Sequence, residues 1–207
     1  MTTMNLSARP ALREVSPTRS ATTGVWVGVA TISMSFAAYT SALVVRQGSA
    51  TDWLHFQLPL TLYANTAIIV ASSITLELAR RNHMPARAVN APDLLQLPGP
   101  APTTVRWLGY TIVLGLAFLI GQLLAWKQLA DQGLFLATNP SSAFFYILTA
   151  LHGLHLLGGL CGLFYVRHRL GRGGPRGAGP ALAAASLYWH FMAVLWVAIL
   201  VLLVVRF

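Results

Sequence analysis

Residues 144–159 read FFYILTALHGLHLLGG, a continuous apolar stretch that carries His152 and His155 three residues apart. A second stretch, SLYWHFMAVLWVAILVLLVV over residues 186–205, carries His190 beside a tryptophan. A helix of about 20 apolar residues is long enough to cross a membrane. An ionisable side chain inside such a helix is costly to bury unless it has a partner, so the three histidines are the first candidates for functional residues.

The rest of the chain repeats this pattern. The composition is 56% hydrophobic and 9% charged, whereas soluble domains carry about 25% charged residues. Lipid offers no partner for backbone groups, so each long apolar segment is predicted to be a helix; spanning strands would run only about 10 residues with alternating polarity. The predicted fold class is all-α, an integral membrane bundle of five transmembrane helices in one domain over residues 24–207. The helices are predicted over residues 24–45, 58–79, 105–126, 142–166 and 182–205.

The charges predict how the bundle lies in the membrane. Eleven of the 14 Lys and Arg residues lie before the first predicted helix, between the second and third, or between the fourth and fifth. By the positive-inside rule, the N-terminus is cytoplasmic and the C-terminus lies outside. Residues 1–23 are rich in Ser, Thr and Pro and are predicted to form a disordered cytoplasmic segment. Basic residues at helix ends suit anionic lipid headgroups, and no nucleic-acid partner is expected.

The intramembrane histidines have two interpretations. On the first, His152, His155 and His190 are structural groups that hydrogen-bond to neighbouring helices in a packed bundle, and Gly158 and Gly162 allow a close helix approach. On the second, His152 and His190 hold a haem or a metal ion between two helices, since imidazole is a common ligand. The first interpretation is favoured, because histidines three residues apart without a carboxylate form an incomplete metal motif.

Other polar residues in the predicted helices are also interpreted as structural groups. Glu77 is the only acidic residue inside them and lies four residues before Arg81, the favourable orientation for an ion pair on one helix. We predict that pair rather than a proton relay. Asn65 is predicted to be a structural group that hydrogen-bonds between helices, and the same is predicted for Thr66, Ser72, Ser73 and Thr75.

The motifs together resemble a known family. HGLHLLGG at residues 152–159 and YWHF at residues 188–191, followed by Trp196, are similar to subunit III of haem–copper oxidases, especially cytochrome c oxidase. Residues 58–76 and 139–155 support the resemblance, which covers all five predicted helices. Family members often have seven helices. This chain resembles the five-helix bacterial form, which lacks the first two, and the resemblance implies a multi-pass protein of the bacterial plasma membrane.

The resemblance also implies a role. The family's subunit III binds neither haem nor copper, so no catalytic, cofactor-binding or metal-binding residue is expected in this chain. Haem and copper are expected in the partner subunits I and II. The implied function is to stabilise the catalytic subunit and support proton uptake in aerobic respiration, with bound phospholipid and with other respiratory complexes as further partners. The family holds lipid headgroups near the cytoplasmic end of the HGLH helix, where Arg167 and Arg169 are the candidates.

The sequence departs from the family at three acidic positions. Ser33 or Met34 stands near the place of a buried glutamate, Ala183 near the place of another, and Ala193 where an aspartate follows the YWHF motif. Proton-related roles of those acids cannot be carried over. The alternatives are an accessory subunit of nitric-oxide reductase, subunit III of a quinol oxidase and, from another class, a haem b membrane anchor. A transporter is disfavoured because no internal repeat is visible.

Overall fold

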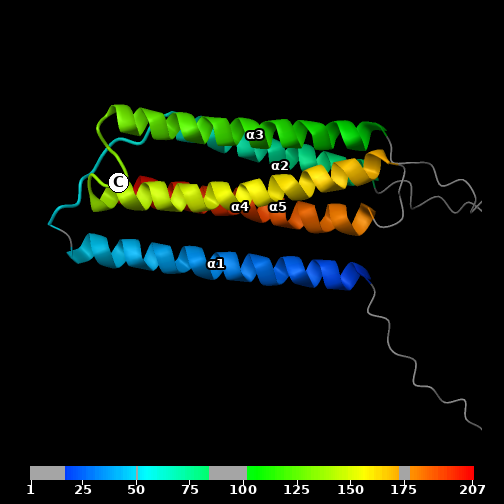
Figure 1. Ribbon diagram of the computed structural model, residues 1–207, viewed down its shortest axis with the longest axis horizontal. Coiled ribbons are helices and arrows are strands. Elements are labelled where there is room, and N and C mark those ends of the chain that lie inside the picture. Colours follow the sequence, from blue (N-terminus) through cyan, green and yellow to red (C-terminus); the bar gives the residue numbers. More distant parts are fainter. Residues whose placement is uncertain (1–16, 50, 84–101, 173–177) are drawn as a thin grey trace, which may run out of the picture.

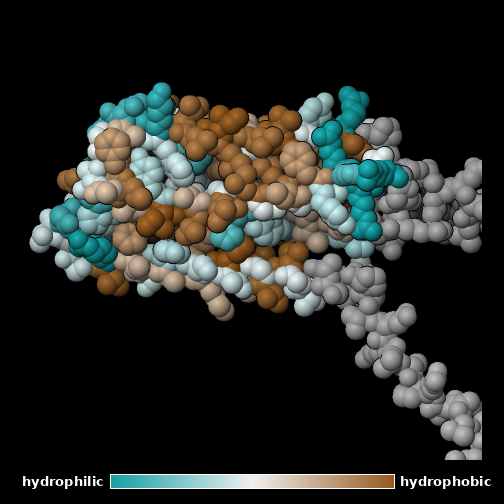
Figure 2. Space-filling model, in the orientation of Figure 1, coloured by the Kyte–Doolittle hydropathy of each residue, from teal (hydrophilic) through white to brown (hydrophobic). Residues whose placement is uncertain are grey.

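The computed structural model describes residues 17–49, 51–83, 102–172 and 178–207, and within these ranges it contains five α-helices and no β-strand. Each helix is long and apolar enough to cross a membrane, which confirms the predicted all-α membrane fold. Figure 2 shows apolar surface over the middle of the helices and hydrophilic residues toward both ends, as a spanning bundle requires. The helices are α1 (Pro17–Ser49), α2 (Thr61–His83), α3 (Pro102–Asp131), α4 (Pro140–Gly171) and α5 (Ala178–Arg206).

Four of the helices form a closed ring and the remaining one lies outside it (Figure 1). α2 packs on α3 and α5, and α4 packs on the same two helices. The α2–α3 interface is the most extensive of the four. Among the described residues, α1 packs only on α5 and, over a smaller area, on α4. The architecture is a four-helix bundle with one additional helix on the side formed by α4 and α5.

Most helices extend beyond the predicted apolar segments, because helical hydrogen bonding continues into the polar headgroup region. α1 begins at Pro17 rather than Gly24, so the last part of the segment predicted to be disordered is helical. A proline is favoured at the first position of a helix. Residues 1–16 lie outside the described ranges. α2 instead begins later than predicted, at Thr61 rather than Leu58, since Pro59 disfavours the helical conformation of the residue before it.

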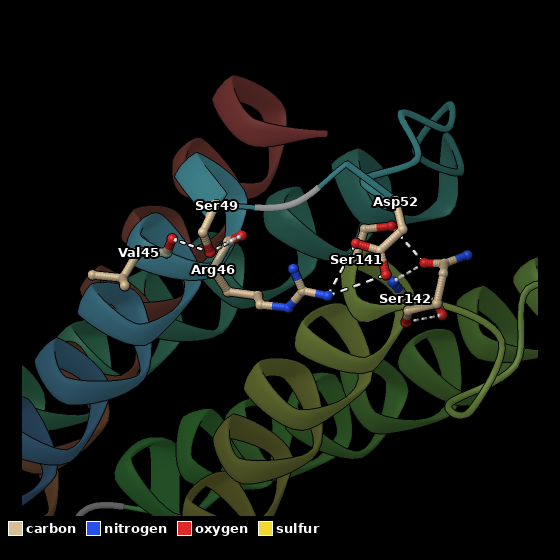
Figure 3. Close-up of polar contacts among 7 residues, drawn as sticks. Val45, Arg46, Ser49, Asp52, Ser141 and Ser142 are labelled. Atoms are coloured by element: carbon tan, nitrogen blue, oxygen red, sulfur yellow. Dashed lines mark hydrogen bonds and ion pairs between the residues drawn. The ribbon is translucent and has the colours of Figure 1, made fainter.

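The start of α4 carries a side-chain cap. Asn139 Oδ1 accepts a hydrogen bond from the Ser142 backbone N–H at 2.8 Å, and a proline occupies the first turn. α4 therefore begins two residues before the predicted start at Ser142, because Asn139 caps its first turn. Figure 3 shows Ser142 at this end of the bundle, together with Arg46 near the end of α1, which reaches Asp52 in the following connection at 3.0 Å.

The connection between α1 and α2 is fastened to the end of α5. Trp53 Nε1 donates to the carbonyl oxygen of Arg206 at 3.2 Å, and the Phe207 ring packs against Trp53 and Phe56. Gln47 of α1 donates to the same carbonyl and accepts a hydrogen bond from the Arg206 guanidinium. We call these five residues the end cluster. It ties one end of α1 to the four-helix ring.

Candidate functional site: interhelical polar groups and a charged groove

Three ring side chains fill the middle of the four-helix ring. Phe118 of α3, His152 of α4 and Trp196 of α5 are fully buried. Their ring centroids are 4.9 Å apart for Phe118–Trp196, 5.2 Å for His152–Trp196 and 5.8 Å for Phe118–His152. Neither ring nitrogen of His152 has a hydrogen-bond partner in the described part of the chain. The prediction that His152 hydrogen-bonds to a neighbouring helix is therefore wrong, because aromatic rings surround it.

His155 lies on the side of α4 that faces α1. Its Nδ1 is 2.7 Å from the carbonyl oxygen of Leu151 in the same helix, and its ring packs on Phe36 of α1. The bond between helices at this residue is made by its backbone: the Tyr188 hydroxyl of α5 donates to the His155 carbonyl at 2.9 Å. The HGLH and YWHF motifs thus build one α4–α5 interface.

Indole N–H groups make the main polar bonds between the ring helices. A buried indole must find an acceptor, and here a hydroxyl on a facing helix supplies it. The predicted interhelical roles of Thr66 and Ser72 are confirmed, whereas the Ser73 hydroxyl is buried without a partner among the described residues. Sequence reasoning placed the hydroxyls on these helices but did not pair them with tryptophans. The three bonds, each 3.0 Å long, run from Trp189 to Ser72, from Trp196 to Thr66 and from Trp126 to Thr149.

Two glycines of α3 allow its close packing. Asn65 of α2 is buried and donates to the Phe118 carbonyl of α3 at 3.4 Å, which confirms its predicted interhelical role. A Cβ at Gly121 would collide with the Asn65 amide, so a larger residue there requires that buried side chain to move. A Cβ at Gly115 would lie 2.7 Å from the Trp189 ring. Sequence analysis missed both positions, since nothing local distinguishes them from other glycines.

The glycines chosen from sequence behave differently. A Cβ at Gly158 or Gly162 would meet no atom within 4 Å, so the small-residue pair makes no close helix contact within the described chain. Gly159 takes that role, because a Cβ there would lie 3.0 Å from the Tyr188 ring. The face that carries Gly158 and Gly162 is open.

A charged cluster lies on the outer side of α2. The Glu77 carboxylate accepts two hydrogen bonds from Arg80, at 2.8 and 3.0 Å, and one from Arg81 at 3.0 Å. The predicted Glu77–Arg81 pair is confirmed, and Arg80 is an additional partner. His190 Nε2 of α5 lies 3.9 Å from the same carboxylate. His190 therefore faces α2, and these four residues form what we call the Glu77 cluster.

Arg167 and Arg169, the lipid-binding candidates, are both exposed but lie in different surroundings. The Arg167 guanidinium lies over Gly109 near the start of α3, where it would be 3.8 Å from an added Cβ. Arg169 instead lies along its own helix, where its guanidinium is 5.9 Å from the centre of the Tyr165 ring. Arg167 is thus placed between two helices, and Arg169 is not.

The positions of the histidines argue against a ligand pair. His152 lies inside the aromatic core, whereas His190 lines the outer side of α2 and α5 beside Glu77. A bis-histidine haem needs two imidazoles on opposite sides of one slot, and these two residues do not share one. Within the described residues, no group of three His, Cys, Asp or Glu side chains could hold a metal ion.

The fold and these contacts define a multi-pass membrane protein in which several polar side chains join neighbouring helices. No family model matches the sequence. The chain nevertheless belongs to the cytochrome c oxidase subunit 3 family, as similarity to curated relatives shows.

The relatives come from distant bacteria. A probable cytochrome c oxidase subunit 3 of Mycobacterium bovis is 31% identical over 171 residues, which cover 79% of this chain and 75% of the relative. The cytochrome c oxidase subunit 3 of Synechocystis is 31% identical over 79% of this chain and 63% of its own length. That of Thermostichus vulcanus is 28% identical over 87% of this chain and 84% of its own length.

Proposed function

We propose that this chain is the non-catalytic subunit III of a haem–copper terminal oxidase, a cytochrome c oxidase, in the plasma membrane of a bacterium. Subunits I and II of that complex carry the haem and copper, and this chain carries neither. Its role is to stabilise the catalytic subunit and to support proton uptake during aerobic respiration. Contacts with other respiratory complexes are part of the same proposal.

One observation carries the proposal: the similarity to relatives named cytochrome c oxidase subunit 3 extends over 79% of the chain. The contacts support it, because the two motifs that resemble the family pack against each other through Tyr188 and His155. Tyr188 and Trp189 of these motifs bond to neighbouring helices and His152 packs in the aromatic core, which suits a stabilising subunit.

We further propose that the chain is the five-helix form of the subunit, with its N-terminus in the cytoplasm and its C-terminus outside. In that orientation the Glu77 cluster, Arg167 and Arg169 lie toward the cytoplasmic side.

Purification of the chain from its native membrane, with identification of the co-purifying subunits and their haems, tests the proposal. A large, haem-bearing partner that oxidises cytochrome c is the expected result. A partner that reduces nitric oxide, or one that oxidises quinol, would favour the corresponding alternative. A haem held by this chain after separation from all partners would contradict the proposal and favour a haem b anchor.

A bound phospholipid at the cytoplasmic end of α4 is part of the proposed function, and the structure sharpens its test. Arg167 lies between α4 and α3, so its guanidinium can bind a phosphate that sits over both helices. We expect Arg167→Gln to release lipid and speed the loss of oxidase activity during turnover, with the initial rate little changed. Arg169→Gln is the matched control. Equal lipid retention in both variants and the wild type would leave these arginines as topology signals.

A further inference from the structure

A groove runs along the outside of the bundle between α2 and α5. It has a volume of about 740 Å³ and opens to the membrane side of the two helices. Its walls are apolar over most of their length, with Val70, Ile74, Val194 and Val197 among the lining residues. One end is different, because Glu77, Arg81 and His190 line it.

The length of the groove matches one leaflet of a membrane. Its lining residues on α2 extend from Val70 to Arg81, and eleven helical steps of about 1.5 Å make roughly 16 Å. The hydrocarbon core of a bilayer is about 30 Å thick, so one leaflet contributes roughly half of that. Arg81 lies two residues before the end of α2 at His83, which puts the charged end of the groove toward the headgroups.

The charged end has an unused cationic group. Two arginines share the single Glu77 carboxylate, which leaves one positive charge in excess. Arg81 uses its Nε in this pair, and its side chain is 75% exposed, so its terminal amino groups remain accessible. A guanidinium in this arrangement can make charge-assisted hydrogen bonds to a phosphate. The Glu77 carboxylate holds the Arg81 side chain in place through its Nε.

We propose that this groove binds one anionic phospholipid, with its phosphate at Arg81 and one acyl chain along Val70, Ile74, Val194 and Val197. The site is separate from Arg167, which lies over α3. The apolar length selects an acyl chain, and the excess positive charge at one end selects an anionic headgroup over a zwitterionic one.

The headgroup is tested by native mass spectrometry of the chain purified with its partners in mild detergent. We expect the wild type to retain one anionic phospholipid. Arg81→Gln should bind this lipid with about ten-fold lower affinity, which is equivalent to about 1.4 kcal/mol. Arg169→Gln is the matched control, because it removes an exposed arginine of another helix and should leave this lipid bound.

The acyl-chain contact is tested without changing any charge. Val197→Phe places a large ring in the groove from an exposed position and should displace the same lipid. Val113→Phe, at an exposed position of α3 outside the groove, should not. Delipidated protein is then mixed with vesicles of phosphatidylcholine alone or with phosphatidylglycerol added, and rebinding should require phosphatidylglycerol.

Three results would each overturn the proposal. The first is equal retention of anionic lipid by the wild type and Arg81→Gln, and the second is rebinding of lipid from vesicles of phosphatidylcholine alone. The third is a partner helix that cross-links along Val194, where the acyl chain is proposed to lie. A variant that elutes as aggregate is replaced by Arg81→Lys. That variant keeps the charge but not the fork of donors, and it should retain the lipid more weakly than the wild type.

Discussion

The four-helix ring and α1 are both membrane-spanning, yet they are held by different interactions. In the ring, side-chain groups bond from one helix to another, as Trp189 does to Ser72. In α1, the hydroxyls of Thr31, Ser33 and Ser35 bond to carbonyl groups four residues earlier in the same helix. Only 17% of the apolar span of α1 is buried, against 39% for α3, α4 and α5. The four ring helices are therefore joined to one another more extensively than α1 is joined to them.

The attachment of α1 is concentrated in a few places. Phe36 packs on His155 of α4 near the middle of the helix, and the end cluster holds its last turns through Gln47. These α1 hydroxyls are already hydrogen-bonded within their own helix and need no partner from outside it. This helix can therefore face lipid or another protein at little cost in free energy. The comparison between ring and α1 can be tested by substitutions that change one and spare the other.

The largest effect is expected for Gly121→Ala in the ring. The new Cβ would collide with the Asn65 amide and break its bond to α3, so we expect a loss of about 1–3 kcal/mol in the free energy of unfolding. Reversible unfolding in sodium dodecyl sulfate measures it. Gly158→Ala is the matched control and should leave stability unchanged or slightly raised, because its Cβ meets nothing. Equal effects at the two glycines would contradict the packing described for α3.

A smaller effect is expected for Trp189→Phe. The change removes the bond to Ser72 and leaves a small cavity in the core, which together cost about 1–2 kcal/mol. Ser35→Ala, the equivalent loss of a hydroxyl bond in α1, should change the unfolding free energy by less than about 0.5 kcal/mol. The distinction between ring and α1 fails if Ser35→Ala is the more damaging substitution.

Gln47→Ala tests the end cluster. The variant loses two hydrogen bonds to Arg206, and we expect about 0.5–1 kcal/mol of local destabilisation. Because the ring does not depend on this contact, the global unfolding midpoint should stay constant while the distance between α1 and α5 becomes more variable. Spin-label distance measurements report the spread. A lower midpoint with an unchanged spread would show that the cluster supports the ring itself.

The smallest effect, with the opposite sign, is expected at His152. Both ring nitrogens are buried and have no hydrogen-bond partner in the part of the chain that the structure describes. Replacing an unsatisfied polar group by an apolar one of similar size is neutral or stabilising. His152→Leu should therefore unfold at the same or a slightly higher free energy than the wild type. A loss of more than about 1 kcal/mol would mean that the imidazole has a partner, such as an internal water molecule.

Local signals in the sequence predicted the spans and several bonding groups. The length of the apolar segments identified all five helices. Asn65 was assigned correctly because an amide in a membrane helix has few alternatives to bonding with a neighbour.

Contacts that depend on relative helix placement could not be predicted. Gly121 looks like any other glycine until Asn65 is placed opposite it. His152 was expected to bond with another helix, but the rings of Phe118 and Trp196 occupy the surrounding space. The register of one helix against another decides such contacts, and that register is set by packing over the whole interface.

The most direct test of the difference between ring and α1 is a spin-label distance measurement on the protein alone and within its native complex. In a Cys161→Ser background, one label pair joins Ser35 of α1 to Val204 of α5, and a second pair joins Tyr110 of α3 to Val204. We predict a narrow distribution for the ring pair in both states, and a distribution for the α1 pair that is broad alone and narrow in the complex. An α1 pair as narrow as the ring pair in the isolated protein would contradict the account.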